Sequence, residues 1–367
     1  MPAFAIYRLP HTDRSFLVQQ TEGEPEELLV CNELNGRQGF VVAPFEITAE
    51  QPICLIRPDR VEEYDGQDAA LEKILDTILA SADSSSAASA ERLHSNITIP
   101  HPSEREYYSI DFANFHAQLQ AGAFRKLVLS RCVEGELPLA ADGETDARVS
   151  PFELYRRACE YYPRMFIALV YTPKSGLWLT ATPEMLLEIG EREWRTIALA
   201  GTQLPGETQW SDKNIQEQRL VATYVAECLE QFTDDFCEEG PYSVRAAHLM
   251  HLRSDFTFTL PDGNHLGDVL QALYPTPAVC GLPKRESFNF IKTNEHTPRR
   301  YYSGFMGMLR PCDTHLYVSL RCMNIEGTHC RLYAGGGLLC DSNEEQEWAE
   351  TEAKLETMRR CIATRRT

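Results

Sequence analysis

The chain has 367 residues, of which 43% are hydrophobic and 24% charged, a composition typical of one large globular domain or two ordinary ones. Its net charge of −19 disfavours nucleic acid and anionic membranes as partners, because both are polyanions. No apolar run approaches the roughly 20 residues of a membrane span, and the N-terminus lacks the pattern of a secretion signal, so we expect a cytoplasmic protein. The twelve cysteines never form a C-x-x-C pair, which predicts neither a disulfide framework nor a zinc site.

The N-terminal part of the chain reads as strands followed by one helix. Residues 1–60 contain short apolar runs broken by Pro, Gly and acidic clusters, which predicts a small strand-rich region. Apolar residues at helical spacing over 71–79 then predict a helix. Residues 81–95 lose all pattern, so we expect an exposed loop there and the most plausible boundary in the chain.

From about residue 105, helix and strand periodicities alternate without a regular β-α-β rhythm. Consecutive strands joined by short turns imply antiparallel pairing, so the pattern favours an α+β fold with large, mostly antiparallel sheets flanked by helices. We expect helices over 109–121, 151–160, the segment around Glu217 and the final segment from 347, and strands over 126–134, 164–171, 176–181, 185–189, 194–199, 243–251, 302–310, 315–325 and 330–335.

A carboxylate interrupts the apolar stripe of the helix around Glu217. An ionised carboxylate is costly to bury alone, so a metal ion or a basic neighbour is its natural partner, whereas the alternative is a solvated Glu at the stripe's edge. The final helix carries Glu347 and Glu350, and carboxylates from two helices would suit magnesium. The stripe shared with Glu217 comprises Leu220, Val221, Tyr224, Val225, Cys228 and Phe232.

Two expected strands carry basic side chains. Lys126 opens the first and is either a desolvated amine that acts as a base or a lysine that extends into water. In the strand over 315–325, Arg321 shares a face with Tyr317 and Ser319, where it could grip a carboxylate or form a surface salt bridge.

Two glycine-containing segments could bring backbone amides close to an anionic ligand, or could simply turn the chain. One is the run Gly335, Gly336 and Gly337, which we expect directly after a strand. The other is ALAGT over 198–202. A proline-rich segment over 273–281 would add a rigid loop that could shape a pocket.

In chain order, these segments resemble conserved stretches of the chorismate-utilising enzymes, and among them of the isochorismate synthases. The resemblance covers roughly residues 105–362, the core of a single chorismate-binding domain over 1–367 in which 1–95 is a shortened, strand-rich N-terminal region. The matching stretches are KLVLSR (126–131), TPEMLL (182–187), ALAGT (198–202), DKNIQEQRLV (212–221), MHL (250–252), LYPTPAVCGLP (273–283), RRYYSGFMG (299–307), YVSLRC (317–322), RLYAGGG (331–337) and EWAETEAKL (347–355).

The resemblance implies magnesium-dependent conversion of chorismate to isochorismate, in which water attacks carbon 2 while the 4-hydroxyl leaves. It matches Lys126 to the base that activates water and Glu184 to the acid that protonates the departing hydroxyl. The matched metal ligands are Glu217 and Glu350, with Glu347 close by. The matched substrate-side residues are Gly201, Thr202, His251, Arg299, Tyr302, Arg321, Gly335, Gly336, Gly337 and Lys354.

Departures from the family pattern affect neighbours of these residues. Asn214 replaces a usual Asp, a Gln stands beside Glu217 where His is common, and Pro298 replaces the Asp before Arg299. Resembling anthranilate synthases typically carry Gln at the position of Lys126, and aminodeoxychorismate synthases a Lys at that of Ala200, so both activities are disfavoured and no glutaminase subunit is expected. A salicylate synthase and a non-catalytic chorismate-binding relative stay open, as does the use of the product for menaquinone or a siderophore.

Overall fold

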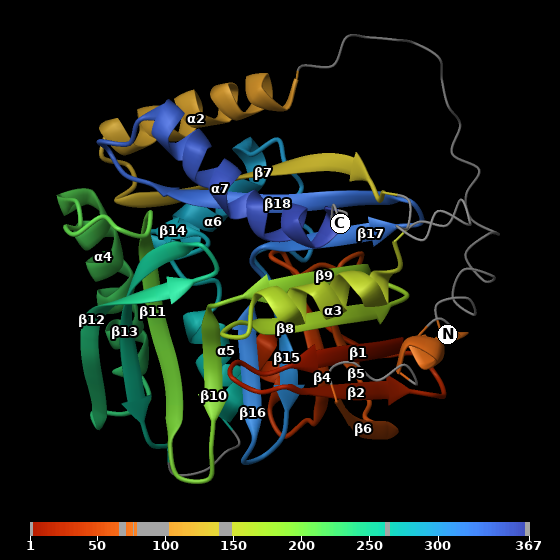
Figure 1. Ribbon diagram of the computed structural model, residues 1–367. Coiled ribbons are helices and arrows are strands. Elements are labelled where there is room, and N and C mark those ends of the chain that lie inside the picture. The colour runs from red at the N-terminus through yellow and green to blue at the C-terminus, as the bar shows by residue number, and fades with distance from the viewer. Residues whose placement is uncertain are drawn as a thin grey trace.

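The computed structural model describes residues 3–65, 71–75, 77–78, 103–138, 149–260 and 265–363. Two antiparallel sheets pack face to face, and helices cover their outer faces (Figure 1). This arrangement confirms the expected α+β class with large antiparallel sheets. The expected loop over 81–95 lies outside the described residues.

The bounds of the elements are as follows. The first sheet has the order β14 (Gly281–Leu282), β7 (Lys126–Glu136), β18 (His329–Leu338), β17 (Cys322–Glu326), β9 (Gly176–Thr182), β8 (Phe166–Thr172), β1 (Ala3–Arg8), β2 (Arg14–Gln20) and β6 (Arg60–Asp65). The second has the order β12 (Phe236–Ala246), β13 (Leu249–Phe258), β11 (Trp194–Gln203), β10 (Met185–Ile189), β16 (Thr314–Val318), β15 (Phe305–Leu309), β4 (Gly39–Ala43), β5 (Ile53–Ile56) and β3 (Glu26–Leu28). The helices are η1 (Cys31–Leu34), α2 (Glu104–Gln120), α3 (Pro151–Tyr161), α4 (Asp212–Leu229), α5 (Leu266–Leu273), α6 (Lys284–Asn294) and α7 (Glu344–Ile362); residues 71–75 and 77–78 are also helical.

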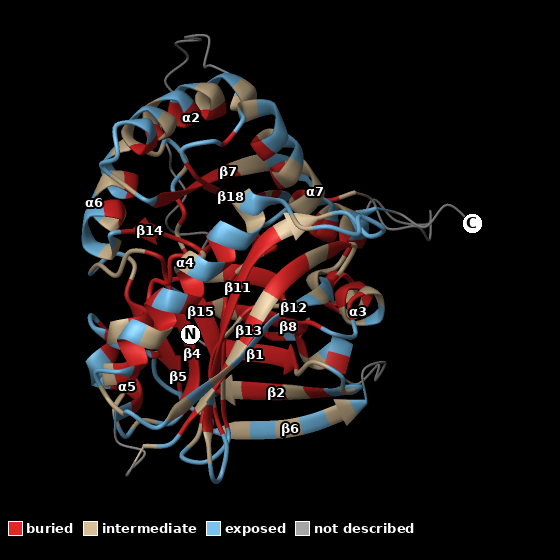
Figure 2. Cartoon of the chain, turned by 90° about the vertical axis from the view of Figure 1, so that its left-hand side faces the viewer, coloured by how far each residue is buried: buried red, intermediate tan, exposed pale blue. Residues whose placement is uncertain are grey.

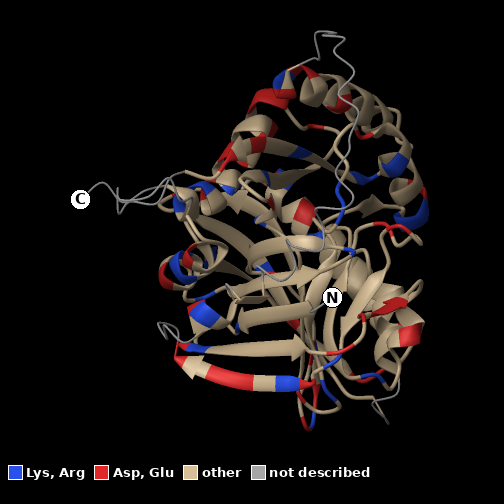
Figure 3. Cartoon of the chain, turned by 90° about the vertical axis from the view of Figure 1, so that its right-hand side faces the viewer, with Lys and Arg blue, Asp and Glu red and all other residues tan. Residues whose placement is uncertain are grey.

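The N-terminal strands are part of both sheets. Strand β1 pairs with β8, and β4 pairs with β15, so segments far apart in the sequence share one hydrogen-bonded ladder. The region is strand-rich, as expected. At the exposed edge of the first sheet, β6 presents charged side chains to solvent, which discourages pairing with another chain (Figure 3).

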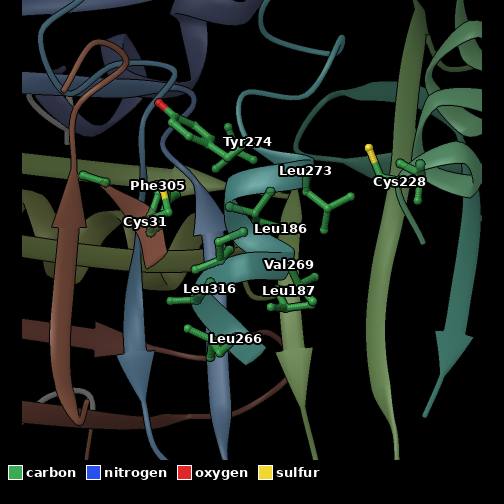
Figure 4. Close-up of a cluster of buried hydrophobic side chains, with 14 of the residues drawn as sticks. Cys31, Leu186, Leu187, Cys228, Leu266, Val269, Leu273, Tyr274, Phe305 and Leu316 are labelled. Carbon is green, nitrogen blue, oxygen red and sulfur yellow. The ribbon is translucent and has the colours of Figure 1, made fainter. Parts of the chain in front are cut away.

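The hydrophobic core has layers on both faces of each sheet. One cluster lies between the sheets and includes Phe166 of β8 stacked on Tyr317 of β16, with ring centroids 4.3 Å apart. On the outer face of the second sheet, Leu266 and Val269 of α5 pack toward Leu316 of β16 (Figure 4). Figure 2 shows most strands buried, with the edge strand β6 an exception, and the helices partly exposed. Strands covered on both sides explain why the sequence shows continuous apolar runs in place of strict alternation.

Three expected elements differ from the structure. Helix α2 begins at Glu104 and not at 109, because Ser103 caps it and pairs with Glu106 in a capping box. The strand expected over 243–251 is wrong, since these residues form the turn between β12 and β13 and the strand ends on either side of it. The strand expected over 315–325 is also wrong, because the chain leaves β16 after Val318 and enters the other sheet as β17. Helices α5 and α6 were not expected. Among the described helices, none is long and apolar enough to cross a membrane.

We expect Gly304→Ala to destabilise the fold, because a β-carbon at Gly304 would overlap the carbonyl oxygen of Ala43, where β4 meets β15. A backbone atom cannot move aside cheaply, so the loss should be about 2–3 kcal/mol in urea unfolding. Gly190→Ala is the matched control, since its added carbon would meet its nearest neighbour at 3.6 Å. Equal unfolding midpoints for both variants would contradict this close approach.

Candidate active site

Two short crossovers carry the chain between the sheets at one corner of the sandwich. Pro183 and Glu184 link β9 of the first sheet to β10 of the second, and residues 319–321 link β16 back to β17. The crossovers are joined, because the carbonyl of Glu184 accepts a hydrogen bond of 2.9 Å from the amide of Val318. The topology therefore brings Glu184 and Arg321, which are far apart in the sequence, to one place.

A cavity opens at this corner, with an empty volume of about 630 Å³ that includes its open mouth. Strands β7, β11, β13 and β18 and helices α4 and α7 supply its walls together with the crossovers. The residues singled out from the sequence that line it are Glu184, Gly201, Thr202, Glu217, His251, Tyr302, Arg321, Gly335, Gly337 and Lys354. Ala278 and Val279 also line it, from the segment over 273–281 that was expected to shape a pocket, as does Leu199 of ALAGT. Sequence reasoning did not single out the apolar lining by Val128, Leu320 and Ala334.

Lys126 and Glu217 form a buried ion pair at the wall of this cavity. The Nζ atom of Lys126 lies 2.9 Å from Oε1 of Glu217, and the lysine is fully buried. Glu217 lines the cavity, whereas Lys126 lies behind it, outside the lining. The solvent-exposed alternatives for both residues are therefore wrong, and Glu217 has the basic neighbour that its burial requires.

The glycine run lies inside β18, where it faces β7, and not after the strand as expected. What glycine provides at Gly337 is room, since a β-carbon there would overlap the carboxylate of Glu217 and lie 2.9 Å from Cε of Lys126. At Gly335 a β-carbon would lie 2.7 Å from the hydroxyl of Tyr302. The missing side chains thus create the space that the functional groups fill.

Glu184 is a buried acid on the first crossover. Burial raises its pKa to about 7, against the opposing positive charges of Lys126, Lys354 and Arg321. A carboxyl group with this pKa is still partly protonated near neutral pH and can donate its proton. An ordinary glutamate would be ionised there.

Arg321 extends from the second crossover with a left-handed backbone (φ 47°), and its side chain is buried. It donates hydrogen bonds to Nε2 of His251 at 2.6 Å and to the carbonyl of Ala246 at 3.1 Å. No carboxylate in the described part of the chain forms an ion pair with Arg321, so the predicted alternative of a surface salt bridge is wrong. Burial lowers the pKa of Arg321 to about 10, which leaves a cation with uncharged partners that can bind an anionic ligand.

His251 is held as a neutral donor and acceptor. Its Nδ1 donates to the carbonyl of Gly201 at 2.8 Å, and its Nε2 accepts from Arg321, a tautomer assigned from these partners. Burial, with the charges of Arg321 and Lys354, lowers the pKa of His251 well below its usual value. Gly201 itself has φ 72° and sits at an irregularity of β11, which glycine tolerates.

Glu347 and Glu350 of α7 lie behind Gly336, next to the cavity but outside its lining. Glu347 pairs with Lys213, and Glu350 accepts hydrogen bonds from Lys354 at 2.7 Å and from the hydroxyl of Thr202 at 3.2 Å. Burial and the charge of Glu350 raise the pKa of Glu347 to about 7. Burial would also raise the pKa of Glu350, but Lys354 and Lys213 outweigh it and hold that pKa below its usual value.

The carboxylates of Glu347 and Glu350 are chemically suited to bind a hard divalent cation. The Oε2 atom of Glu347 is buried and has no hydrogen-bond partner among the described residues, and such an oxygen is costly unless a cation meets it. Carboxylate oxygens are the ligands that magnesium prefers. As they stand, the described residues contain no group of three potential ligands close enough to hold a metal ion.

Two supporting residues were not given their roles from the sequence. Arg299, matched to the substrate side, lies outside the lining and makes a bidentate pair with Glu295 at 2.6 and 2.7 Å. It also donates to the carbonyls of Val128 and Val279, which fixes two lining residues. Asn214 was noted only as a departure from the family pattern. Its side-chain amide donates a hydrogen bond of 3.1 Å to the carbonyl of Thr202 and so supports the irregular part of β11.

A model of the chorismate binding enzyme family matches residues 32–363, so the chain belongs to this family. The isochorismate synthase MenF of Escherichia coli (strain K12) is 35% identical over 254 residues, which are 66% of this chain and 56% of that protein. The anthranilate synthase component 1 of Thermococcus kodakarensis is 25% identical over 229 residues, 58% of this chain and 52% of that protein. The matched part thus spans little more than half the length of these relatives.

A solved structure confirms the fold. The putative 2,3-dihydroxybenzoate-specific isochorismate synthase DhbC of Bacillus anthracis superposes with a TM-score of 0.76 at 21% identity, covering 98% of this chain and 96% of that one.

We expect His251 to be neutral at neutral pH, with its proton on Nδ1, because its pKa is lowered by burial and by Arg321. Histidine side-chain ¹⁵N spectra across a pH series would measure this, with His251→Gln identifying the signal. A cationic His251 at neutral pH, or a proton on Nε2, would contradict the proposed hydrogen bonds.

Proposed function

We propose that this protein is an isochorismate synthase, which converts chorismate to isochorismate by adding water at carbon 2 as the 4-hydroxyl departs. The observation that carries this proposal is one cavity that combines a carboxyl group protonated near neutral pH, Glu184, with a buried amine, Lys126, directly behind its wall. Water attack needs a proton acceptor and hydroxyl departure needs a proton donor, so both groups are required. Binding alone would need neither.

The charges around the cavity suit a dicarboxylate. Arg321 and Lys354 line it as cations and can bind one substrate carboxylate. The opposite side is acidic, through Glu217 and the neighbouring Glu347 and Glu350. We propose that these three carboxylates hold a magnesium ion, which would supply the positive charge that a second substrate carboxylate needs there.

The proton balance assigns a role to each residue. Lys126 accepts a proton from the attacking water, whose oxygen bonds to carbon 2, the ring double bond shifts, and the bond from carbon 4 to oxygen breaks. Glu184 gives its proton to the departing hydroxyl, so one water enters and one leaves. Lys126 must first lose its own proton to solvent, and with it the ion pair with Glu217, because an ammonium ion cannot act as a base.

The wall residues disfavour amine nucleophiles. Ala200 lines the cavity and is uncharged, so no lysine is present there to attack the ring. Lys126 occupies the position at which resembling anthranilate synthases typically carry Gln. The product would feed either menaquinone or siderophore synthesis.

Product analysis of purified protein with chorismate and magnesium tests the assignment. We expect isochorismate as the product and no turnover in excess EDTA. Salicylate with pyruvate would identify a salicylate synthase, and anthranilate after addition of ammonium an amine-dependent enzyme. Absence of any product with magnesium would contradict an enzymatic role.

We expect Lys126→Gln to abolish water addition while chorismate still binds. Removing a base acts on the transition state, so turnover should fall at least ~100-fold while affinity changes by less than about tenfold, or ~1.4 kcal/mol. Isothermal titration calorimetry with chorismate would measure the affinity, and product assays would measure the turnover. Lys292→Gln, which changes a lysine paired with Glu46 outside the cavity, is the control. Parental turnover in Lys126→Gln would remove Lys126 from the mechanism.

We expect kcat/KM to fall as the pH rises through about 7, because Glu184 must be protonated to act and loses its proton there. Glu184→Gln cannot donate a proton, so its activity should be lower by roughly 10²–10⁴-fold and should not show this decline. Rate profiles of both proteins between pH 6 and 9 would measure it. A decline of equal size in Glu184→Gln would assign the titration to another group.

A further inference from the structure

Lys213 is a largely buried cation to which the chemistry above gives no role. It lies in the first turn of α4, and its Nζ forms an ion pair with Oε1 of Glu347 on α7. The side chain of Glu347 is only 1% exposed, and that of Lys213 is 22% exposed. Lys213 does not line the cavity, so its charge acts on Glu347 and its neighbours and not on a bound substrate.

Because Lys213 pairs with one carboxylate oxygen of Glu347, the position of the other oxygen is also defined. Oε2 of Glu347 is buried with no hydrogen-bond partner among the described residues. A β-carbon placed on Gly336 would lie 3.5 Å from this oxygen and 3.6 Å from Oε1 of Glu350. Both oxygens therefore approach the same point beside Gly336.

Two buried carboxylates repel each other, and each needs a compensating charge. Glu350 has Lys354 at 2.7 Å, and Glu217 has Lys126 at 2.9 Å. Lys213 completes this series as the counter-ion of Glu347. Without it, Glu347 would lose its counter-ion.

We propose that Lys213 is a positioning residue for the divalent cation: by holding one oxygen of Glu347 it turns the other toward Glu350, where the metal binds. The inference rests on the magnesium ion of the proposed function. Residues that orient a ligand in this way typically change metal affinity by about 10–100-fold when they are replaced.

A manganese titration followed by electron paramagnetic resonance tests this without turnover, using the full chain and no substrate. Lys213→Met should bind Mn²⁺ at least about tenfold more weakly, whereas Lys213→Arg, which keeps the charge, should stay within about threefold. Lys292→Met is the matched control, because it removes a lysine from a Lys–Glu pair outside the cavity. With chorismate, Lys213→Met should need more magnesium for half-maximal rate but reach a similar kcat at saturation.

Unchanged Mn²⁺ affinity in Lys213→Met would overturn the proposal, and tighter binding would do so by showing that Lys213 competes with the metal. Circular dichroism verifies folding, and Lys213→Gln gives a second uncharged variant, with the same expectation, should the Met variant not fold. If the parental protein forms isochorismate and both uncharged variants bind metal normally, only the role of Lys213 is refuted. Parental protein that binds Mn²⁺ but forms no isochorismate refutes only the proposed reaction. Failure of the parental protein to bind Mn²⁺ overturns the role of Lys213 as well.

Discussion

The two crossovers between the sheets are the constraint on which the site depends. Packed sheets cannot slide independently, because their inner faces share one close-packed core. The chain passes from one sheet to the other in only two residues at Glu184 and in only three residues before β17. Because both ends of each crossover are held by a sheet, we expect the crossovers to be rigid. The left-handed backbone of Arg321 is tolerated there because the surrounding ladders fix it. An acid and a cation are thereby placed without any long or mobile segment.

Charge compensation is the second organising feature. Glu217 and Glu347 are buried and Glu350 is half-buried, and each is paired with its own lysine from another part of the fold or from the next helical turn. A buried carboxylate without such a partner would carry a penalty of several kcal/mol. The pairs let the chain fold with its acidic groups already close together. Because lysines neutralise these carboxylates, the site can bind an anion although the whole protein has a net charge of −19.

The sequence predicted the elements whose patterns are local. Glu217 was detectable because a carboxylate in an apolar stripe is anomalous, and the strands because they are apolar runs between turn residues. The crossover at 319–321 was not detectable, since alternation continues through it from β16 into β17 although the strands belong to different sheets. Lys126 could be read as exposed or buried, because its burial depends on α4 and β18, which are distant in sequence. The N-cap at Ser103 was a local signal and was overlooked.

Burial has opposite effects on the ionisable groups of this cavity, and the difference gives it its chemistry. It raises the pKa of Glu184, which keeps an acid protonated, and lowers that of His251, which keeps an imidazole neutral. Because His251 is neutral, it can accept a hydrogen bond from Arg321 without adding a second positive charge beside it. Arg321 is thus oriented by uncharged acceptors and retains its charge for a ligand. Burial in one cavity therefore supplies both a proton donor and a cation that forms no ion pair with a carboxylate of the described residues.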